Sequence, residues 1–214
     1  MEKEIRKIPK IKICGITREA EAEYLNEFCI DYAGFVFYEK SKRNITLGQA
    51  EKIFEKLDPR IKKVAVTVSP DTKQIEMLNA SGFDIIQIHK EFSPEILKVV
   101  KKPVWRAINI SDAHSFEMLK CDEDKEGVLT GILVDAADFG SGKSFDWNEA
   151  EVFLHPGRRW RGMDFILAGG LKKENVAEGI RIFEPDIVDV SSGVEGENGK
   201  DRKRIEEFVS AVRK

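Results

Sequence analysis

The sequence predicts an α/β protein of the (β/α)8 TIM-barrel class. Eight short apolar runs recur along the 214 residues, and segments with apolar residues three and four apart lie between them. The runs do not alternate polar and apolar residues, which is typical of parallel strands that are buried on both faces. Eight strand–helix units in this length average about 27 residues each, close to the minimum for such a unit. We expect residues 1–214 to form a single domain.

The predicted strands follow the apolar runs in chain order. They occupy residues 11–16, 32–37, 64–68, 85–89, 104–109, 131–136, 165–170 and 187–193. A doubly wound open sheet is the alternative fold, but it usually has fewer parallel strands and a glycine-rich turn after the first strand. Here the first turn is Cys-Gly-Ile-Thr, and the glycines cluster late in the chain. The pattern therefore favours the closed barrel.

Helices are predicted between the strands from apolar spacing and from start signals. The spacing is helical in two clear places, which are Ile53, Phe54 and Leu57, and Ile205, Phe208, Val209 and Val212. The start signals are the capping pairs Thr46 with Gln49 and Asp146 with Glu149, and the serine–proline pairs Ser69-Pro70 and Ser93-Pro94. Each signal predicts that a helix begins immediately afterwards.

Composition excludes several classes of partner. Lysine and arginine number 35 against 38 acidic residues, so the net charge of -3 argues against a nucleic-acid-binding surface. The local basic clusters at 158–161 and 200–204 are expected to be solvated loop or helix faces. No uncharged run reaches the roughly 18 residues that a membrane span needs, and the N-terminal segment has no apolar core of a signal peptide. We therefore expect a cytoplasmic protein without a membrane partner.

Neither the cysteines nor the histidines form a metal or disulfide pattern. The three cysteines lack CxxC spacing, the three histidines are scattered, and no HExxH motif is present. We expect no metal, no cofactor and no disulfide framework.

In a (β/α)8 barrel the active site lies at the C-terminal ends of the strands. Cys14, His89 and Asp135 stand at such ends, and Lys12 points to the same face of its strand as Cys14. A partly buried carboxyl group at Asp135 suits a general acid, whereas Cys14 is a useful base only if nearby donors or cations favour its thiolate. Arg43, in the loop after the second strand, is either a carboxylate-binding group or a surface cation.

Glycines and serines in the last two strand–helix loops predict a phosphate site. Gly169 and Gly170 follow the seventh strand, and Ser192 and Gly193 follow the eighth. Backbone N–H groups in these two loops commonly hold a phosphate in such barrels. Gly142, in the segment Gly-Ser-Gly-Lys-Ser, is expected to belong to a short lid rather than to a nucleotide-binding loop. The expected partner is thus a small phosphorylated substrate.

As a set, these segments resemble the phosphoribosylanthranilate isomerase family of tryptophan biosynthesis. The resemblance runs from Lys12 to about Phe208 and rests on KICGIT, GFVFYEKSKR, IIQIH, GILVDA, GSGKSFDW, LAGGLKKENV and VDVSSGVE. It implies a cofactor-free Amadori rearrangement of N-(5'-phosphoribosyl)anthranilate to 1-(2-carboxyphenylamino)-1-deoxyribulose 5-phosphate.

The resemblance also implies a role for each matching residue. Asp135 would be the acid and Cys14 the base, while Arg43 would bind the anthranilate carboxylate. The phosphate would be held by Gly169, Gly170, Ser192 and Gly193, with Gly142 in the lid. Lys12 and His89 would line the site. The chain is expected to be a monomer or a homodimer. The alternatives are another phosphosugar isomerase or epimerase, and a non-catalytic barrel that binds a phosphorylated metabolite.

Overall fold

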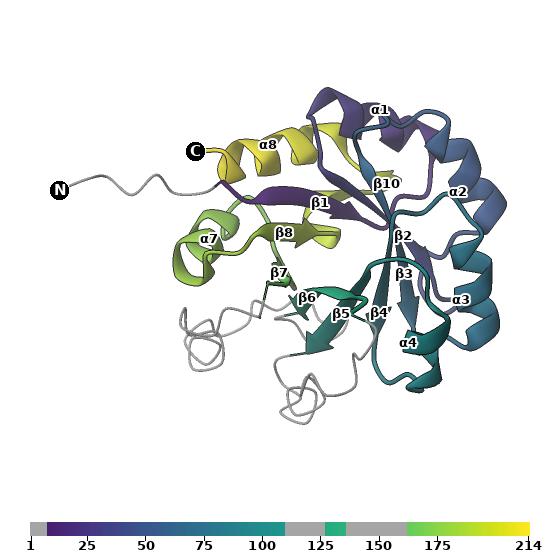
Figure 1. Ribbon diagram of the computed structural model, residues 1–214. Helices are drawn as coiled ribbons and strands as arrows, with labels where there is room; N and C mark the ends of the chain where they lie inside the picture. The colour runs from purple at the N-terminus through teal and green to yellow at the C-terminus, as the bar shows by residue number, and fades with distance from the viewer. Residues whose placement is uncertain (1–7, 110–126, 136–161) are drawn as a thin grey trace.

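The chain folds into a closed parallel barrel whose strands are neighbours in chain order (Figure 1). The computed structural model describes residues 8–109, 127–135 and 162–214. The barrel strands are β1 Lys10–Cys14, β2 Tyr32–Phe37, β3 Lys62–Val68, β4 Ile85–His89, β5 Val104–Asn109, β6 Leu129–Asp135, β7 Asp164–Ala168 and β8 Ile187–Val190. The predicted (β/α)8 class is confirmed, and the open-sheet alternative is excluded because β8 pairs with β1.

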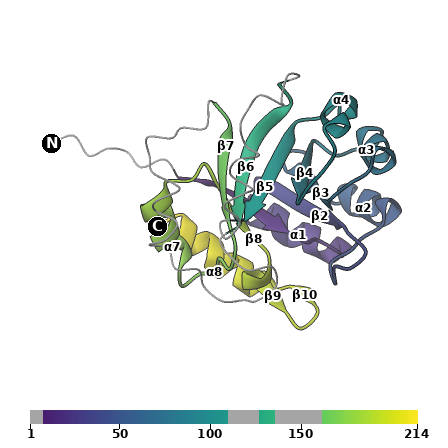
Figure 2. The same cartoon turned by 90° about the horizontal axis from the view of Figure 1, so that it is seen from below.

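Helices surround the barrel on its outer side. They are α1 Glu19–Glu27, α2 Leu47–Phe54, α3 Thr72–Asn79, α4 Glu95–Val99, α7 Val176–Phe183 and α8 Arg202–Val212. After β8 the chain also forms the 3-10 turn η1 Ser192–Val194 and a small hairpin, β9 Glu195–Gly196 with β10 Gly199–Lys200 (Figure 2). The predicted helix start at Asp146 and Glu149 lies outside the described residues.

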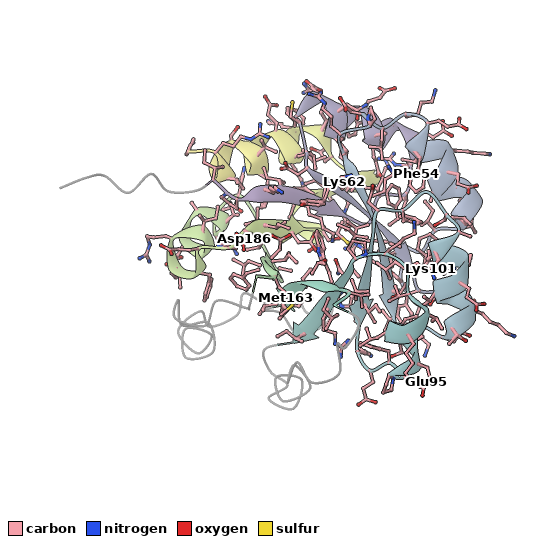
Figure 3. All side chains as sticks on the ribbon, viewed as in Figure 1. Phe54, Lys62, Glu95, Lys101, Met163 and Asp186 are labelled. Carbon is pink, nitrogen blue, oxygen red and sulfur yellow. The ribbon has the colours of Figure 1, made fainter. Side chains whose placement is uncertain are left out.

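The two faces of each strand bury two separate apolar layers. Ile11 and Ile13 belong to a large cluster shared with helix residues such as Leu25 and Phe208. The alternate positions supply a second cluster, which contains Tyr32, Val36, Val64, Val66, Trp105, Ala107, Leu133, Ile166, Ala168 and Ile187. Because side chains alternate along a strand, this second cluster fills the barrel interior. Figure 3 shows side chains filling the layer between strands and helices.

The strand ends differ slightly from the predicted ranges, and the backbone explains why. β2, β4 and β5 match the expected ranges. β1 ends at Cys14 rather than at residue 16, because Gly15 has a φ of 83° and both Gly15 and Ile16 donate their N–H groups to the Gly34 carbonyl. β7 likewise ends before Gly169 and Gly170, whose φ values are 91° and 63°.

The predicted helix starts have mixed outcomes. The capping box of Thr46 and Gln49 is confirmed at the start of α2. The expected start at Ser69 is wrong, because the Ser69 N–H bonds to the His89 carbonyl and Asp71 caps α3 instead. At α4 the Ser93 hydroxyl accepts a hydrogen bond from the Glu95 N–H at 3.2 Å, as expected of a capping residue. The helix itself begins at Glu95, one residue later than expected.

Candidate active site

Cys14 ends β1 and lies partly exposed where the chain leaves the barrel. Its neighbour on β2 is Gly34, where a Cβ atom would lie only 3.0 Å from the Cys14 sulfur. The glycine therefore makes room for the thiol. On the other side, the Ser191 hydroxyl donates a hydrogen bond of 2.9 Å to the Cys14 carbonyl. These contacts fix the end of β1 between β2 and the loop after β8.

A buried ion pair lies one layer below Cys14. The Lys12 ammonium is 2.7 Å from Asp189 Oδ2, and the two side chains are 0% and 7% exposed. Asp189 Oδ1 has no hydrogen-bond partner among the described residues. Lys12 and Asp189 are register partners, so this pair joins β1 to β8 where the barrel closes. The pair opposes the cost of burial and holds the pKa of Lys12 above its ordinary value.

The electrostatics around Cys14 differ from what a ready thiolate needs. Burial raises the pKa of the Cys14 thiol, Lys12 and Lys200 lower it, and the Asp189 carboxylate raises it again. The net pKa is above its ordinary value of 9.0. The cations beside Cys14 thus favour the thiolate that a base needs, but burial outweighs them, and Cys14 is a thiol at neutral pH.

His89 ends β4 as a neutral imidazole. Burial, together with the charges of Lys12, Arg106 and Lys90, lowers its pKa to about 3. Its Nε2 atom lies 2.7 Å from Nε2 of Gln87. His89 therefore carries no charge at the barrel mouth.

Asp135 ends β6 and is half-buried. Its register partners are Asn109 on β5 and Ala168 on β7. Two strands, β7 and β8, separate it from β1, so Asp135 and Cys14 stand on different sides of the barrel mouth. The proposed lid residue Gly142 lies outside the described residues.

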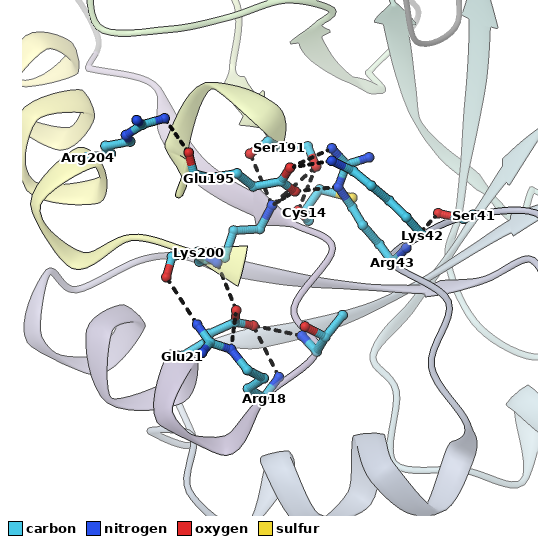
Figure 4. Close-up of polar contacts among 11 residues, drawn as sticks. Cys14, Arg18, Glu21, Ser41, Lys42, Arg43, Ser191, Glu195, Lys200 and Arg204 are labelled. Atoms are coloured by element: carbon cyan, nitrogen blue, oxygen red, sulfur yellow. Dashed lines mark hydrogen bonds and ion pairs between the residues drawn. The ribbon is translucent and has the colours of Figure 1, made fainter. Parts of the chain in front are cut away.

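Arg43 is held in an ion cluster and is not a free surface cation (Figure 4). Its Nε atom donates to Oε1 of Glu195, and its Nη2 atom donates to Oε2 at 2.9 Å. The Lys200 ammonium also donates to Oε1 of Glu195 at 2.9 Å, and Lys42 lies 3.2 Å from Oε2. Although burial opposes ionisation, the bonds from Arg43 and Lys200 hold the pKa of Glu195 well below its usual value.

Lys200 corrects one expectation from the sequence. The basic run 200–204 was expected to be solvated, but the Lys200 side chain is fully buried. Its ammonium donates to the Ser191 carbonyl at 3.0 Å as well as to Glu195. A buried lysine requires such partners, because an unpaired ammonium is costly in the interior.

The two predicted phosphate loops are brought into contact. Gly169 and Gly170 form the sharp turn after β7, and the Asn175 side chain donates to the Gly170 carbonyl at 3.1 Å. Gly193, in η1, packs so closely on the loop after β7 that a Cβ atom there would lie 3.1 Å from the Leu171 carbonyl carbon and closer still to its oxygen. Ser192 beside it is exposed.

Asp189, Glu195 and Lys200 belong to the site but were not predicted from the sequence. Asp189 could have been predicted, because a carboxylate inside the apolar run Ile-Val-Asp-Val requires a partner. Lys12, in another apolar run, is a suitable partner. Glu195 and Lys200 lie in loop sequence with no such signal.

Two features are absent from the described part of the chain. No group of three or more histidine, cysteine, aspartate or glutamate side chains there could hold a metal ion. Among the described helices, none is long and apolar enough to cross a membrane.

Comparison with known proteins identifies the family. A model of the N-(5'-phosphoribosyl)anthranilate isomerase family matches residues 11–211. The N-(5'-phosphoribosyl)anthranilate isomerase of Clostridium acetobutylicum is 38% identical, with 96% of this chain and 98% of that protein covered. The crystal structure of phosphoribosylanthranilate isomerase from Thermotoga maritima superposes with a TM-score of 0.80 at 32% identity and covers 96% of this chain and 98% of that one.

A second solved structure adds a ligand. It is a phosphoribosylanthranilate isomerase in complex with reduced 1-(o-carboxyphenylamino)-1-deoxyribulose 5-phosphate, with a TM-score of 0.78 at 31% identity, and it covers 96% of this chain and 98% of that one. The match extends over nearly the whole length of each relative and over the strand ends described above. The chain therefore belongs to the N-(5'-phosphoribosyl)anthranilate isomerase family, whose members are isomerases of tryptophan biosynthesis.

Proposed function

We propose that Cys14 and Asp135 carry out the Amadori rearrangement of N-(5'-phosphoribosyl)anthranilate to 1-(2-carboxyphenylamino)-1-deoxyribulose 5-phosphate. The observation that carries the proposal is their placement. Each ends a barrel strand, and β7 and β8 lie between those strands. A sugar bound across the mouth would therefore present its ring oxygen to one group and its C2' hydrogen to the other.

The proton transfers follow from that placement. Asp135 gives a proton to the furanose oxygen, and the ring opens as the nitrogen lone pair forms an iminium. Cys14 then takes the C2' proton, which leaves an enolamine. Tautomerisation of the enolamine to the ketone places a proton on C1' and removes the one on the C2' hydroxyl, so the reaction is an isomerisation with no net proton change.

The remaining groups would bind the two ends of the substrate. Arg43 is a planar bidentate donor suited to the anthranilate carboxylate. The backbone at Gly169, Gly170, Ser192 and Gly193, with Gly142 from the lid, is proposed to hold the phosphate. A relative that holds a phosphorylated carboxyphenylamino ligand supports the proposed class of substrate. Lys12 and His89 are proposed to line the site. A monomeric or homodimeric state, a cytoplasmic location and a single-domain chain stay predictions.

Turnover of the two single variants tests the proposed roles. Cys14→Ser and Asp135→Asn should each lower kcat by about 10²–10⁴-fold, because each removes a positioned base or acid. The measurement is the loss of anthranilate-type fluorescence on addition of freshly prepared N-(5'-phosphoribosyl)anthranilate. Cys29→Ser is the matched control, since this exposed thiol lies outside the site. Near-normal turnover in either site variant, with a folded protein, would refute the role given to that residue.

A further inference from the structure

The cluster around Glu195 uses only one edge of the Arg43 guanidinium. Glu195 is bound by the Nε and Nη2 atoms. A guanidinium has five N–H donors, so two on Nη1 and one on Nη2 remain. No bond to Nη1 is formed among the described residues. The edge formed by Nη1 and Nη2 can therefore accept a second carboxylate in bidentate geometry while Glu195 stays bound.

The charge of the cluster is unbalanced in favour of an anion. Three cations, Arg43, Lys42 and Lys200, surround the single Glu195 carboxylate. Lys42 is 74% exposed and is screened by solvent, whereas Arg43 is 25% exposed. An incoming carboxylate would thus meet the partly desolvated guanidinium of Arg43, which Glu195 already holds in place.

Glu195 is itself fixed from several sides. It stands opposite Lys200 in the hairpin of β9 and β10, and the fully buried Lys200 ammonium binds it. Lys200 in turn donates to Ser191, whose hydroxyl binds the Cys14 carbonyl. Arg43, Glu195, Lys200, Ser191 and Cys14 therefore form one continuous polar network (Figure 4).

We infer that Glu195 is a positioning residue that orients Arg43 and thereby makes the site selective for the carboxylate on the aromatic ring of the substrate. This inference rests on the proposed function. Anchoring the guanidinium before the ligand arrives removes part of the entropy cost of ordering it, and this gain applies only to ligands that have the carboxylate. A residue that merely stabilised the fold would affect ligands with and without the carboxylate alike.

The test compares two ligands that differ only in that group. They are 1-(2-carboxyphenylamino)-1-deoxyribitol 5-phosphate and its phenylamino counterpart, with Kd measured by calorimetry. In Glu195→Gln the preference for the carboxylated ligand should fall about tenfold, whereas Kd for the phenylamino ligand should change less than about threefold. KM for N-(5'-phosphoribosyl)anthranilate should rise by a similar factor, which is larger than any fall in kcat. Glu197→Gln removes an exposed carboxylate from the same hairpin and is the matched control.

A second variant keeps the test decisive if the buried Lys200 charge makes Glu195→Gln unfold. Glu195→Gln with Lys200→Met removes the carboxylate together with the buried ammonium and still frees Arg43, so the same loss of preference is expected. An unchanged or increased preference in a folded variant overturns the inference, the increase by showing that Glu195 competes with the ligand. If the wild-type protein neither binds the carboxylated ligand nor turns over the substrate, the proposed function fails, and the inference fails with it.

Discussion

At the scale of single residues, the ionisation of Cys14 depends on the charged side chains around it. Lys12 and Lys200 favour its thiolate, Asp189 disfavours it, and burial disfavours it most. A thiol with a raised pKa is rarely ionised at neutral pH, but the thiolate is a stronger base when it forms. The surrounding charges therefore set both quantities together: a higher pKa lowers the fraction of thiolate and raises its basicity.

This balance predicts the pH dependence of Cys14 alkylation. The thiolate is the reactive form, and burial raises the pKa of Cys14, so the alkylation rate should rise about tenfold per pH unit from pH 6 to pH 8 without a plateau. Iodoacetamide labelling followed by mass spectrometry of the Cys14 peptide measures this rate. Exposed Cys29 in the same sample is the internal reference.

Two variants separate electrostatics from packing in this experiment. Lys12→Met removes a charge that lowers the Cys14 pKa and should slow alkylation at a fixed pH, whereas Asp189→Asn removes one that raises it and should speed alkylation. Loosened packing alone would speed both. A plateau below pH 8, or the same direction of change in both variants, would show that this account of Cys14 is wrong.

At the scale of elements, the loops after β7 and β8 support each other through one close contact. Gly193 in η1 faces the Leu171 carbonyl with no space for a side chain. A Cβ at this position must displace backbone, which is less adaptable than the end of a side chain. The shapes of the two proposed phosphate loops are therefore coupled.

Gly193→Ala is expected to disturb both loops. It should lower the free energy of unfolding by about 1–3 kcal/mol and weaken binding of the phosphorylated substrate, seen as a higher KM. Urea unfolding and steady-state kinetics measure the two effects. Gly48→Ala, in α2 with no atom within 4 Å of the added Cβ, is the control: it should leave KM unchanged and raise the free energy of unfolding by up to about 1 kcal/mol through helix propensity. Wild-type stability and KM in Gly193→Ala would contradict the coupling.

At the scale of the whole molecule, the seam between β1 and β8 closes the barrel and contains the Lys12–Asp189 pair. Lys12→Met leaves a buried carboxylate without its cation and should lower the free energy of unfolding by about 3–5 kcal/mol. Denaturant unfolding measures this loss. Lys10→Met, which removes an exposed lysine from the same strand, should cost less than about 1 kcal/mol.

The double variant of the seam provides the complementary result. Lys12→Met with Asp189→Leu removes both charges, so no ion remains unpaired in the interior, and much of the lost stability should return. If the double variant is as unstable as the sum of the single variants, the pair does not act as a unit across the seam.

The sequence by itself determined the class of fold and most strand positions. Apolar runs without alternation are a local pattern, and burial on both faces of a parallel strand is its direct physical cause. Strand ends then located Cys14, His89 and Asp135, because all parallel strands of a barrel point their C-terminal ends to one rim. Helix starts were less certain, as Ser69 shows, since its N–H group bonds to the next strand instead of preceding a helix.

Only the tertiary structure decided which charges meet. Arg43 and Glu195 are 152 residues apart in the chain, and Lys12 and Asp189 are 177 apart. No local spacing encodes such contacts. Closure of the barrel brings the first and last strands together, and the hairpin after β8 then carries Glu195 and Lys200 to Arg43. For the same reason the state of Cys14 could not be predicted from its strand, because burial and three distant or neighbouring charges together set its pKa.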